Sequence, residues 1–267
     1  MRLKLGRVLG IDVFLHWTFF LAPAYLIYAW RTQGLPWGMV GIMLILLIAV
    51  FTCVLMHEYG HALMARRFGV ETQDIIITPI GGLARLQGMP RRPVEELLIT
   101  IAGPAVNLVI AIGFLLLLVA TGKSVFPSSG FDGLKEFAPM MLWMNLILFF
   151  FNLIPAFPMD GGRILRSTLA FFIPHREATL VAGILGQICA LLFAVFGFFA
   201  GQYSLILIGV FIIFAARYEM RASRLMYEHE LRQKEAQERA TQFGGAIVEG
   251  TVVEGEVVGP SHSSIET

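Results

Sequence analysis

His57-Glu58-Tyr59-Gly60-His61 directly follows an unbroken apolar run from Met39 to Met56. About twenty apolar residues suffice for a helix to cross the hydrocarbon of a bilayer, so the run with this pentad predicts a membrane span. The two histidines are one helical turn apart and face the same side of a helix, where they can bind one zinc ion. Glu58 is placed beside them to handle protons. The sequence therefore predicts a metal-binding helix inside a membrane.

The composition of the chain excludes an ordinary soluble protein. Of 267 residues, 57% are hydrophobic and only 15% charged, and the mean hydropathy is +0.73. These values are typical of a polytopic membrane protein. The net charge of +1 gives no reason to expect a nucleic-acid partner. Cys53 and Cys189 both lie in apolar runs, so we expect buried thiols and neither a disulfide framework nor a cysteine zinc site.

Six apolar segments predict an all-α polytopic fold with six transmembrane helices, of which the last is short. They cover roughly Val13 to Trp30, Gly38 to Arg66, Glu95 to Ala120, Lys135 to Asn152, Ala178 to Ala200 and Tyr203 to Arg217. We therefore expect a membrane domain over residues 1–217. A charged cytoplasmic helix is expected over 218–243, and a disordered tail over 244–267, where apolar mass is too low for a core.

The basic residues predict the orientation of the spans. With the N-terminus in the cytoplasm, seventeen of the twenty Lys and Arg residues face inward, and the three on the other side are Arg31, Lys123 and Lys135. The positive-inside rule then predicts a multi-pass protein of the cell membrane with both termini cytoplasmic. Arg66 marks the inner interface, and at about 1.5 Å per residue His61 and His57 lie about 8 and 14 Å deeper.

After the second span, residues 71–86 favour strands. The β-branched run Ile75 to Thr78, a break at Pro79 and Gly81-Gly82, and a second apolar stretch predict a small membrane-associated β-hairpin or sheet. An open sheet edge cannot face lipid, so this edge must be shielded, lie at the interface or pair with another strand.

The stretch from Asn152 to Arg163 carries the second polar group at depth. Pro155 and Pro158 cannot continue a regular helix, so the fourth span ends near Asn152 and the chain runs irregularly to Asp160. Irregular backbone at depth must be buried in protein or line a water-filled cavity. Asp160 is the best candidate for the third zinc ligand, because no other acidic residue except Glu58 has a context that predicts depth. The alternative is that Asp160 caps a turn with Gly161 at the interface.

The third span contains Ala102-Gly103-Pro104 and Asn107, which place small residues, a kink and an amide at membrane depth. Helix packing and a direct part in a site explain this pattern equally well. The remaining histidines are expected to be solvated or structural; they are His16, His175, His229 and His262.

Together these motifs resemble the site-2 protease family of intramembrane zinc metalloproteases, over roughly Gly6 to Arg217. The chain looks like the minimal six-span type, without the PDZ or CBS domains of many relatives. The resemblance implies a three-helix catalytic core and one Zn²⁺ per chain, bound by His57, His61 and Asp160. It also implies that Glu58 is the general base and acid, and that Asn152 lies near the metal and helps to hold the substrate or the oxyanion.

The resemblance further implies hydrolysis of a peptide bond within or near the transmembrane segment of single-span membrane proteins. Such substrates include anti-sigma factors and transcription-factor precursors, which the enzyme would meet in the lipid bilayer. A substrate helix must unwind before cleavage, and strand addition to the edge near Ile75 to Thr78 would hold it extended.

Three other functions remain open from the residues alone. A zinc transporter would also place His and Asp at depth, but it needs polar residues along a path across the membrane. A catalytically inactive membrane scaffold would usually have lost a ligand or the glutamate. A different class of membrane metalloprotease would use a glutamate as third ligand, and the candidates are Glu136 and Glu177.

Overall fold

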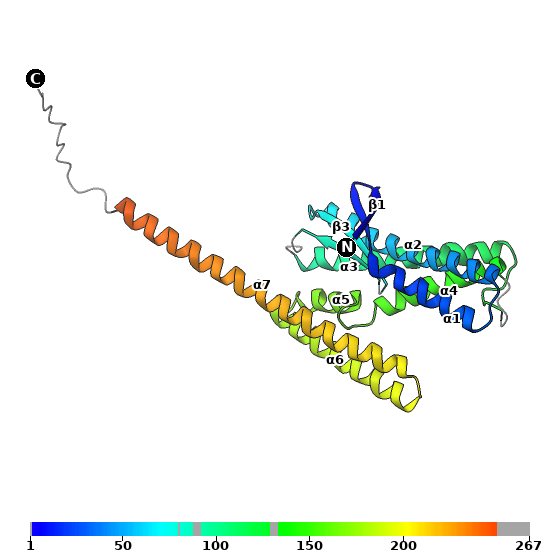
Figure 1. Ribbon diagram of the computed structural model, residues 1–267. Helices are drawn as coiled ribbons and strands as arrows, with labels where there is room; N and C mark the ends of the chain where they lie inside the picture. Colours follow the sequence, from blue (N-terminus) through cyan, green and yellow to red (C-terminus); the bar gives the residue numbers. More distant parts are fainter. Residues whose placement is uncertain (1, 80, 88–91, 129–132, 250–267) are drawn as a thin grey trace, which may run out of the picture. The chain divides into compact units, whose positions relative to one another are not determined.

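The computed structural model describes residues 2–79, 81–87, 92–128 and 133–249. The chain forms two compact units, Met1–Met220 and Arg221–Thr267. Along the chain the elements are β1 (Arg2–Val8), β2 (Ile11–His16), a 3₁₀ turn (Trp17–Phe20), α1 (Leu21–Thr32), α2 (Trp37–Arg67), β3 (Thr72–Thr78), β4 (Gly81–Leu86), α3 (Pro93–Ala120), a 3₁₀ turn (Gly133–Glu136), α4 (Phe137–Asn152), α5 (Asp160–Leu169), α6 (His175–Phe199) and α7 (Tyr203–Glu249) (Figure 1).

Four helices in the described part of the chain are long and apolar enough to cross a membrane: α2, α3, α6 and residues Tyr203–Ala222 of α7. The apolar helix α4 is shorter, with 16 residues. The predicted span Val13 to Trp30 is wrong, because it divides into the end of β2, a 3₁₀ turn and the 12-residue helix α1. A helix of that length is only about 18 Å long. Hydropathy cannot distinguish a buried strand from part of a buried helix, which explains the error.

The strands form one sheet in the order β1-β2-β3-β4, so the mostly helical fold carries a larger sheet than the hairpin or small sheet predicted after the second span. The predicted hairpin after the second span is confirmed as the antiparallel pair β3–β4. Its strand β3 also pairs in parallel with β2, which forms a second hairpin with β1. The edge that we expected near Ile75 to Thr78 is therefore occupied on both sides. Of the two strands of this hairpin, β4 is the one at an edge of the sheet.

The sheet packs against the half of α2 that carries the histidine pentad. Alternate residues of β2 and β3 share a buried cluster with α2; its members are Ile11, Val13, Leu15, Tyr59, Ala62, Ile75 and Ile77. The Tyr59 hydroxyl donates to the carbonyl of Val8 over 3.1 Å, and Nη2 of Arg66 donates to the carbonyl of Leu9 over 2.7 Å. Apolar burial and these two hydrogen bonds fix the sheet beside the pentad.

Helices α2, α3 and α4 contact one another in pairs, and α2 and α3 lie side by side (Figure 1). Gly60 allows this close approach, because a Cβ there would lie 2.6 Å from the carbonyl oxygen of Ala102. As predicted, the fourth apolar segment ends at Asn152, and residues 153–159 form no helix. Helix α5 begins against this irregular stretch, since a Cβ at Gly161 would lie 2.2 Å from the carbonyl oxygen of Ile154.

A buried ion cluster ties α5 to its neighbours. Nε of Arg166 donates to Oε1 of Glu96 in α3 over 2.9 Å, and Nη1 donates to Oε1 of Glu219 in α7 over 3.1 Å. The guanidinium also lies 5.4 Å from the ring centre of Phe157. Arg166 is 3% exposed and Glu96 8%. Because Arg166 belongs to the helix that begins at Asp160, the cluster also fixes the position of Asp160.

Replacing Arg166 by Met is expected to lower the free energy of unfolding by about 3–5 kcal/mol, since it removes the guanidinium that neutralises the buried Glu96 carboxylate. Thermal unfolding of the protein in detergent measures the change. The matched control is Arg224→Met, which breaks the exposed i,i+4 pair with Glu228. That change is expected to cost only about 0.3–0.5 kcal/mol. Equal losses of stability in the two variants would contradict the conclusion that the buried ion pairs of Arg166 hold α5 in place.

The second unit contains the rest of α7, which is helical to Glu249. The charged helix predicted over 218–243 thus lies within α7, and the helix continues into the segment where low apolar content predicts a tail. Residues 250–267 lie outside the described residues.

Candidate zinc site

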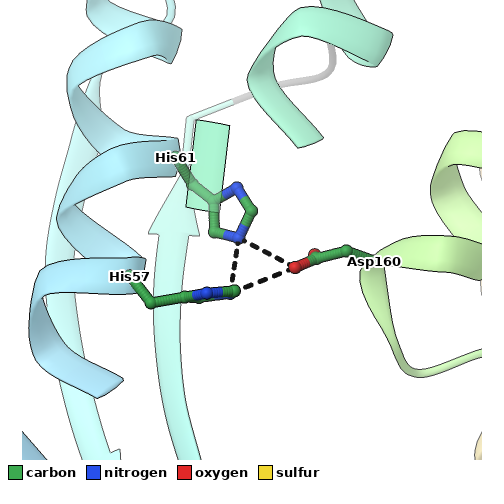
Figure 2. Close-up of side chains that lie close together, drawn as sticks. All are labelled: His57, His61 and Asp160. Carbon is green, nitrogen blue, oxygen red and sulfur yellow. Dashed lines mark hydrogen bonds and ion pairs between the residues drawn. The ribbon is translucent and has the colours of Figure 1, made fainter. Parts of the chain in front are cut away.

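Three polar side chains converge between α2 and the start of α5 (Figure 2). The Nε2 atoms of His57 and His61 are 3.1 Å apart. Oδ2 of Asp160 lies 3.0 Å from Nε2 of His57 and 3.2 Å from Nε2 of His61. Within the described ranges, this is the group of three His, Cys, Asp or Glu side chains placed to hold a metal ion. The helical spacing of the histidines and the proline break before Asp160 therefore bring the predicted ligands together.

Local structure explains how Asp160 reaches this position. It is the first residue of α5 and follows the irregular stretch that ends α4. At a helix N-terminus the partial positive charge of the backbone favours a carboxylate. Asp160 is 8% exposed, and α5 contacts α3. The alternative of an interfacial turn cap is not observed, because this carboxylate faces the two imidazoles.

The hydrogen bond at Nδ1 of His61 shows that the other ring nitrogen, Nε2, carries a lone pair toward the three-residue group. Nδ1 of His61 lies 2.8 Å from the carbonyl oxygen of Ile99. A carbonyl oxygen can only accept, so Nδ1 carries the proton and Nε2 of the neutral ring carries a lone pair. Such a backbone partner on the outer nitrogen is a common feature of metal-binding histidines.

The site fits a zinc ion on three observations. First, the lone pair on Nε2 of His61 faces Oδ2 of Asp160, a buried oxygen without a hydrogen-bond donor, so two acceptors meet. Second, separations of 3.0–3.2 Å are close to the roughly 3.3 Å between tetrahedral ligands at about 2.0 Å from zinc. Third, Gly103 leaves the space free: a Cβ there would lie 2.2 Å from Nε2 of His61. Nitrogen and carboxylate donors are also those that zinc prefers.

Glu58 is held on the side of the sheet. Its Oε2 accepts a hydrogen bond from the backbone nitrogen of Ala84 in β4 over 3.0 Å. A Cβ at Gly82 would lie 2.4 Å from Cγ of Glu58, so β4 can approach this closely only with glycine there. The predicted general base is thus positioned by the edge strand, a contact that sequence analysis did not predict.

Two groups of predicted site residues have other contacts. Nδ2 of Asn152 donates to the carbonyl of Leu148 on its own helix over 2.9 Å, and its role near the metal stays a prediction. Glu136 accepts hydrogen bonds from Ser128, and Glu177 lies exposed in the first turn of α6. Neither glutamate belongs to the three-residue group, which argues against a glutamate as third ligand.

Asn145 lies in α4 and accepts a hydrogen bond from Asn107, a contact that the sequence pattern does not predict. A signal was present, since Asn145 is a lone amide in the middle of an otherwise apolar segment. Burying an amide is unfavourable unless it is hydrogen-bonded, so such a residue needs a partner.

The fold and the site together define a class: membrane-embedded proteins with a buried His–His–Asp centre and a His-Glu-x-x-His helix. Comparison with known proteins agrees, because the profile of peptidase family M50 matches residues 45–138 and 123–196. The chain belongs to peptidase family M50.

Individual relatives support this membership. A protein of Methanocaldococcus jannaschii named as a zinc metalloprotease is 37% identical over 196 residues, 73% of this chain and 53% of that protein. Stage IV sporulation protein FB of Bacillus subtilis is 30% identical over 133 residues, 49% of this chain and 43% of that protein. The chain thus spans about half the length of these curated relatives. The solved structure of the site-2 protease from Methanocaldococcus jannaschii superposes with a TM-score of 0.60 at 33% identity, covering 82% of this chain and 95% of that one.

Proposed function

We propose that this protein is an intramembrane zinc metalloprotease that hydrolyses a peptide bond within or near the transmembrane segment of single-span membrane proteins. The observation that carries the proposal is the convergence of His57, His61 and Asp160, with Glu58 beside them. The two histidines and Glu58 lie on α2, which is apolar enough to span a membrane. A protease with its centre at this depth acts where a buried peptide bond lies. Anti-sigma factors and transcription-factor precursors are substrates of this kind.

Each residue has a distinct part in the proposed reaction. His57, His61 and Asp160 would hold the zinc ion, which when bound acidifies a water molecule and polarises a carbonyl group. Glu58 would accept a proton from the attacking water and return it to the leaving amine. The bond from Ala84 holds the Glu58 carboxylate in place while it does so. Asn152 is proposed to help hold the substrate or the oxyanion.

The sheet offers a way to present an unwound substrate. Because β3 is paired on both sides, strand addition would take place at β4, and not near Ile75 to Thr78 as first expected. The residues of β4 contact Glu58 through Ala84 and lie against it at Gly82. A substrate strand added there would run beside the general base. With both termini in the cytoplasm, as the charge distribution predicts, water would reach the site from the cytoplasmic side.

Metal removal tests the proposal. The purified full-length chain in detergent is expected to contain one zinc per chain and to cleave a model single-span substrate. Cleavage should stop when a chelator removes the zinc and return when zinc is added back, because the ligands would then again hold the metal. Zinc analysis and gel assays of the substrate measure both. A chain that binds zinc but cleaves no single-span protein would favour transport or a scaffold.

A further inference from the structure

Asn107 and Asn145 form a buried chain of hydrogen bonds that begins at His57. Oδ1 of Asn107 in α3 lies 2.6 Å from Nδ1 of His57, and Nδ2 of Asn107 donates to Oδ1 of Asn145 over 3.0 Å. Nδ2 of Asn145 donates in turn to the carbonyl of Met141 over 2.9 Å. Both amide side chains are 0% exposed. This chain, which we call the amide relay, joins α2, α3 and α4.

The far end of the amide relay fixes the direction of every bond in it. The carbonyl of Met141 can only accept, so the Asn145 amide must turn its nitrogen toward Met141 and its oxygen toward Asn107. Asn107 must then donate to that oxygen and present its own oxygen to His57. An oxygen acceptor at Nδ1 requires the proton of the imidazole to be there. Nε2, which faces Asp160, is left with its lone pair.

We propose that Asn145 is a positioning residue for metal binding, which acts on His57 through Asn107. Without Asn145, the amide of Asn107 can rotate and donate to Nδ1 of His57. The proton of the neutral ring then moves to Nε2, and that tautomer cannot bind a metal ion through Nε2. The amide relay therefore keeps His57 in the tautomer that can bind a metal ion. The proposal rests on one part of the proposed function, which is that zinc binds at this site.

Zinc affinity of the full-length chain in detergent, measured by competition with a chromophoric chelator, tests the proposal. Asn107→Leu is expected to weaken zinc binding by about 10- to 100-fold, as is usual when the partner of a metal-binding histidine is removed. Asn145→Leu, of nearly the same size, should weaken binding by about five-fold through the loss of one orienting hydrogen bond. The two losses should not add, because both act through the same bond to His57.

A rescue variant distinguishes positioning from packing. A carboxylate accepts with either oxygen, so Asn107→Asp does not depend on Asn145 for its orientation. In the Asn145→Leu background, Asn107→Asp is expected to restore zinc affinity to within about three-fold of wild type, since a carboxylate partner also suits a zinc-bound histidine. If Asn145 only packs, Asn107→Asp changes zinc affinity by the same factor with and without Asn145→Leu, and the deficit caused by Asn145→Leu remains.

Leu142→Ala is the matched control. Leu142 is buried in α4 one turn before Asn145 and packs on Ala111 and Leu118. Its truncation should lower the unfolding temperature without changing zinc affinity. Wild-type zinc affinity in Asn145→Leu, or a failure of Asn107→Asp to restore it, would overturn the proposal. A wild-type chain that binds zinc but cleaves nothing would instead contradict the proposed protease function alone.

Discussion

Replacing Glu58 by Gln is expected to abolish peptide cleavage while zinc stays bound. Glutamine has the size of glutamate, and its Oε1 can still accept the hydrogen bond that Ala84 donates to Glu58. It cannot take up a proton, and general acid–base catalysis contributes about 10²- to 10⁴-fold to a rate. We therefore expect the cleavage rate of a single-span substrate to fall by at least about 10²-fold. Assays at saturating zinc, with the zinc content measured on the same sample, test both parts.

Glu136→Gln and Glu177→Gln are the controls for this prediction. These two glutamates are the candidates for a third ligand in a different metalloprotease class, and neither lies in the three-residue group. Both substitutions should leave cleavage and zinc content unchanged. Full cleavage by Glu58→Gln would refute the assignment of Glu58 as general base, and zinc loss in either control would favour the other class.

The predicted ligands lie where expected because their placement depends on local rules. His57 and His61 share a helix face because of the helical period, and Pro155 and Pro158 end α4 before Asp160. These rules act within a few residues along the chain, and the pattern of residues displays them directly. The two motifs are about a hundred residues apart. Their sequence contexts place both at a similar depth in the membrane, and this similar depth predicts that they meet.

The sheet was only half predicted because strand pairing is not local. Residues 75–78 were recognised as a strand from their β-branched side chains. The apolar residues of β2 fit a span equally well, and only their pairing with β3, some sixty residues later, distinguishes the two. The same reason explains why Ala84 and Gly82 were not linked to Glu58. Those contacts exist only once β4 lies against α2.

Asn145 differs from both cases, because the sequence shows that this amide needs a hydrogen-bond partner but does not show which residue provides it. A lone amide in an apolar helix predicts a buried partner, whereas the identity of that partner depends on how α3 and α4 pack. The structure supplies Asn107, and through it the connection to His57.

Replacing Gly103 by Ala is expected to prevent zinc binding. The added methyl group would lie 2.2 Å from Nε2 of His61 and 2.8 Å from Nε2 of His57. Neither ring can move aside freely, because Ile99 and Asn107 hold them from behind. The methyl group would also occupy the space in which the ion must sit. Losing the hydrogen-bond partner of a metal ligand weakens metal binding by up to about 100-fold. Because this methyl group displaces the ion itself, we expect zinc affinity to fall by more than about 100-fold.

Gly113→Ala on the same helix is the matched control, because a Cβ there meets nothing within 4 Å. Alanine forms helix better than glycine by about 1 kcal/mol, so this control should bind zinc normally and unfold no earlier than wild type. Gly103→Ala gains the same propensity, and a loss of zinc therefore cannot come from a weaker helix. Chelator competition and thermal unfolding separate these effects. Wild-type zinc affinity in Gly103→Ala would mean that the metal is held elsewhere than between His57, His61 and Asp160.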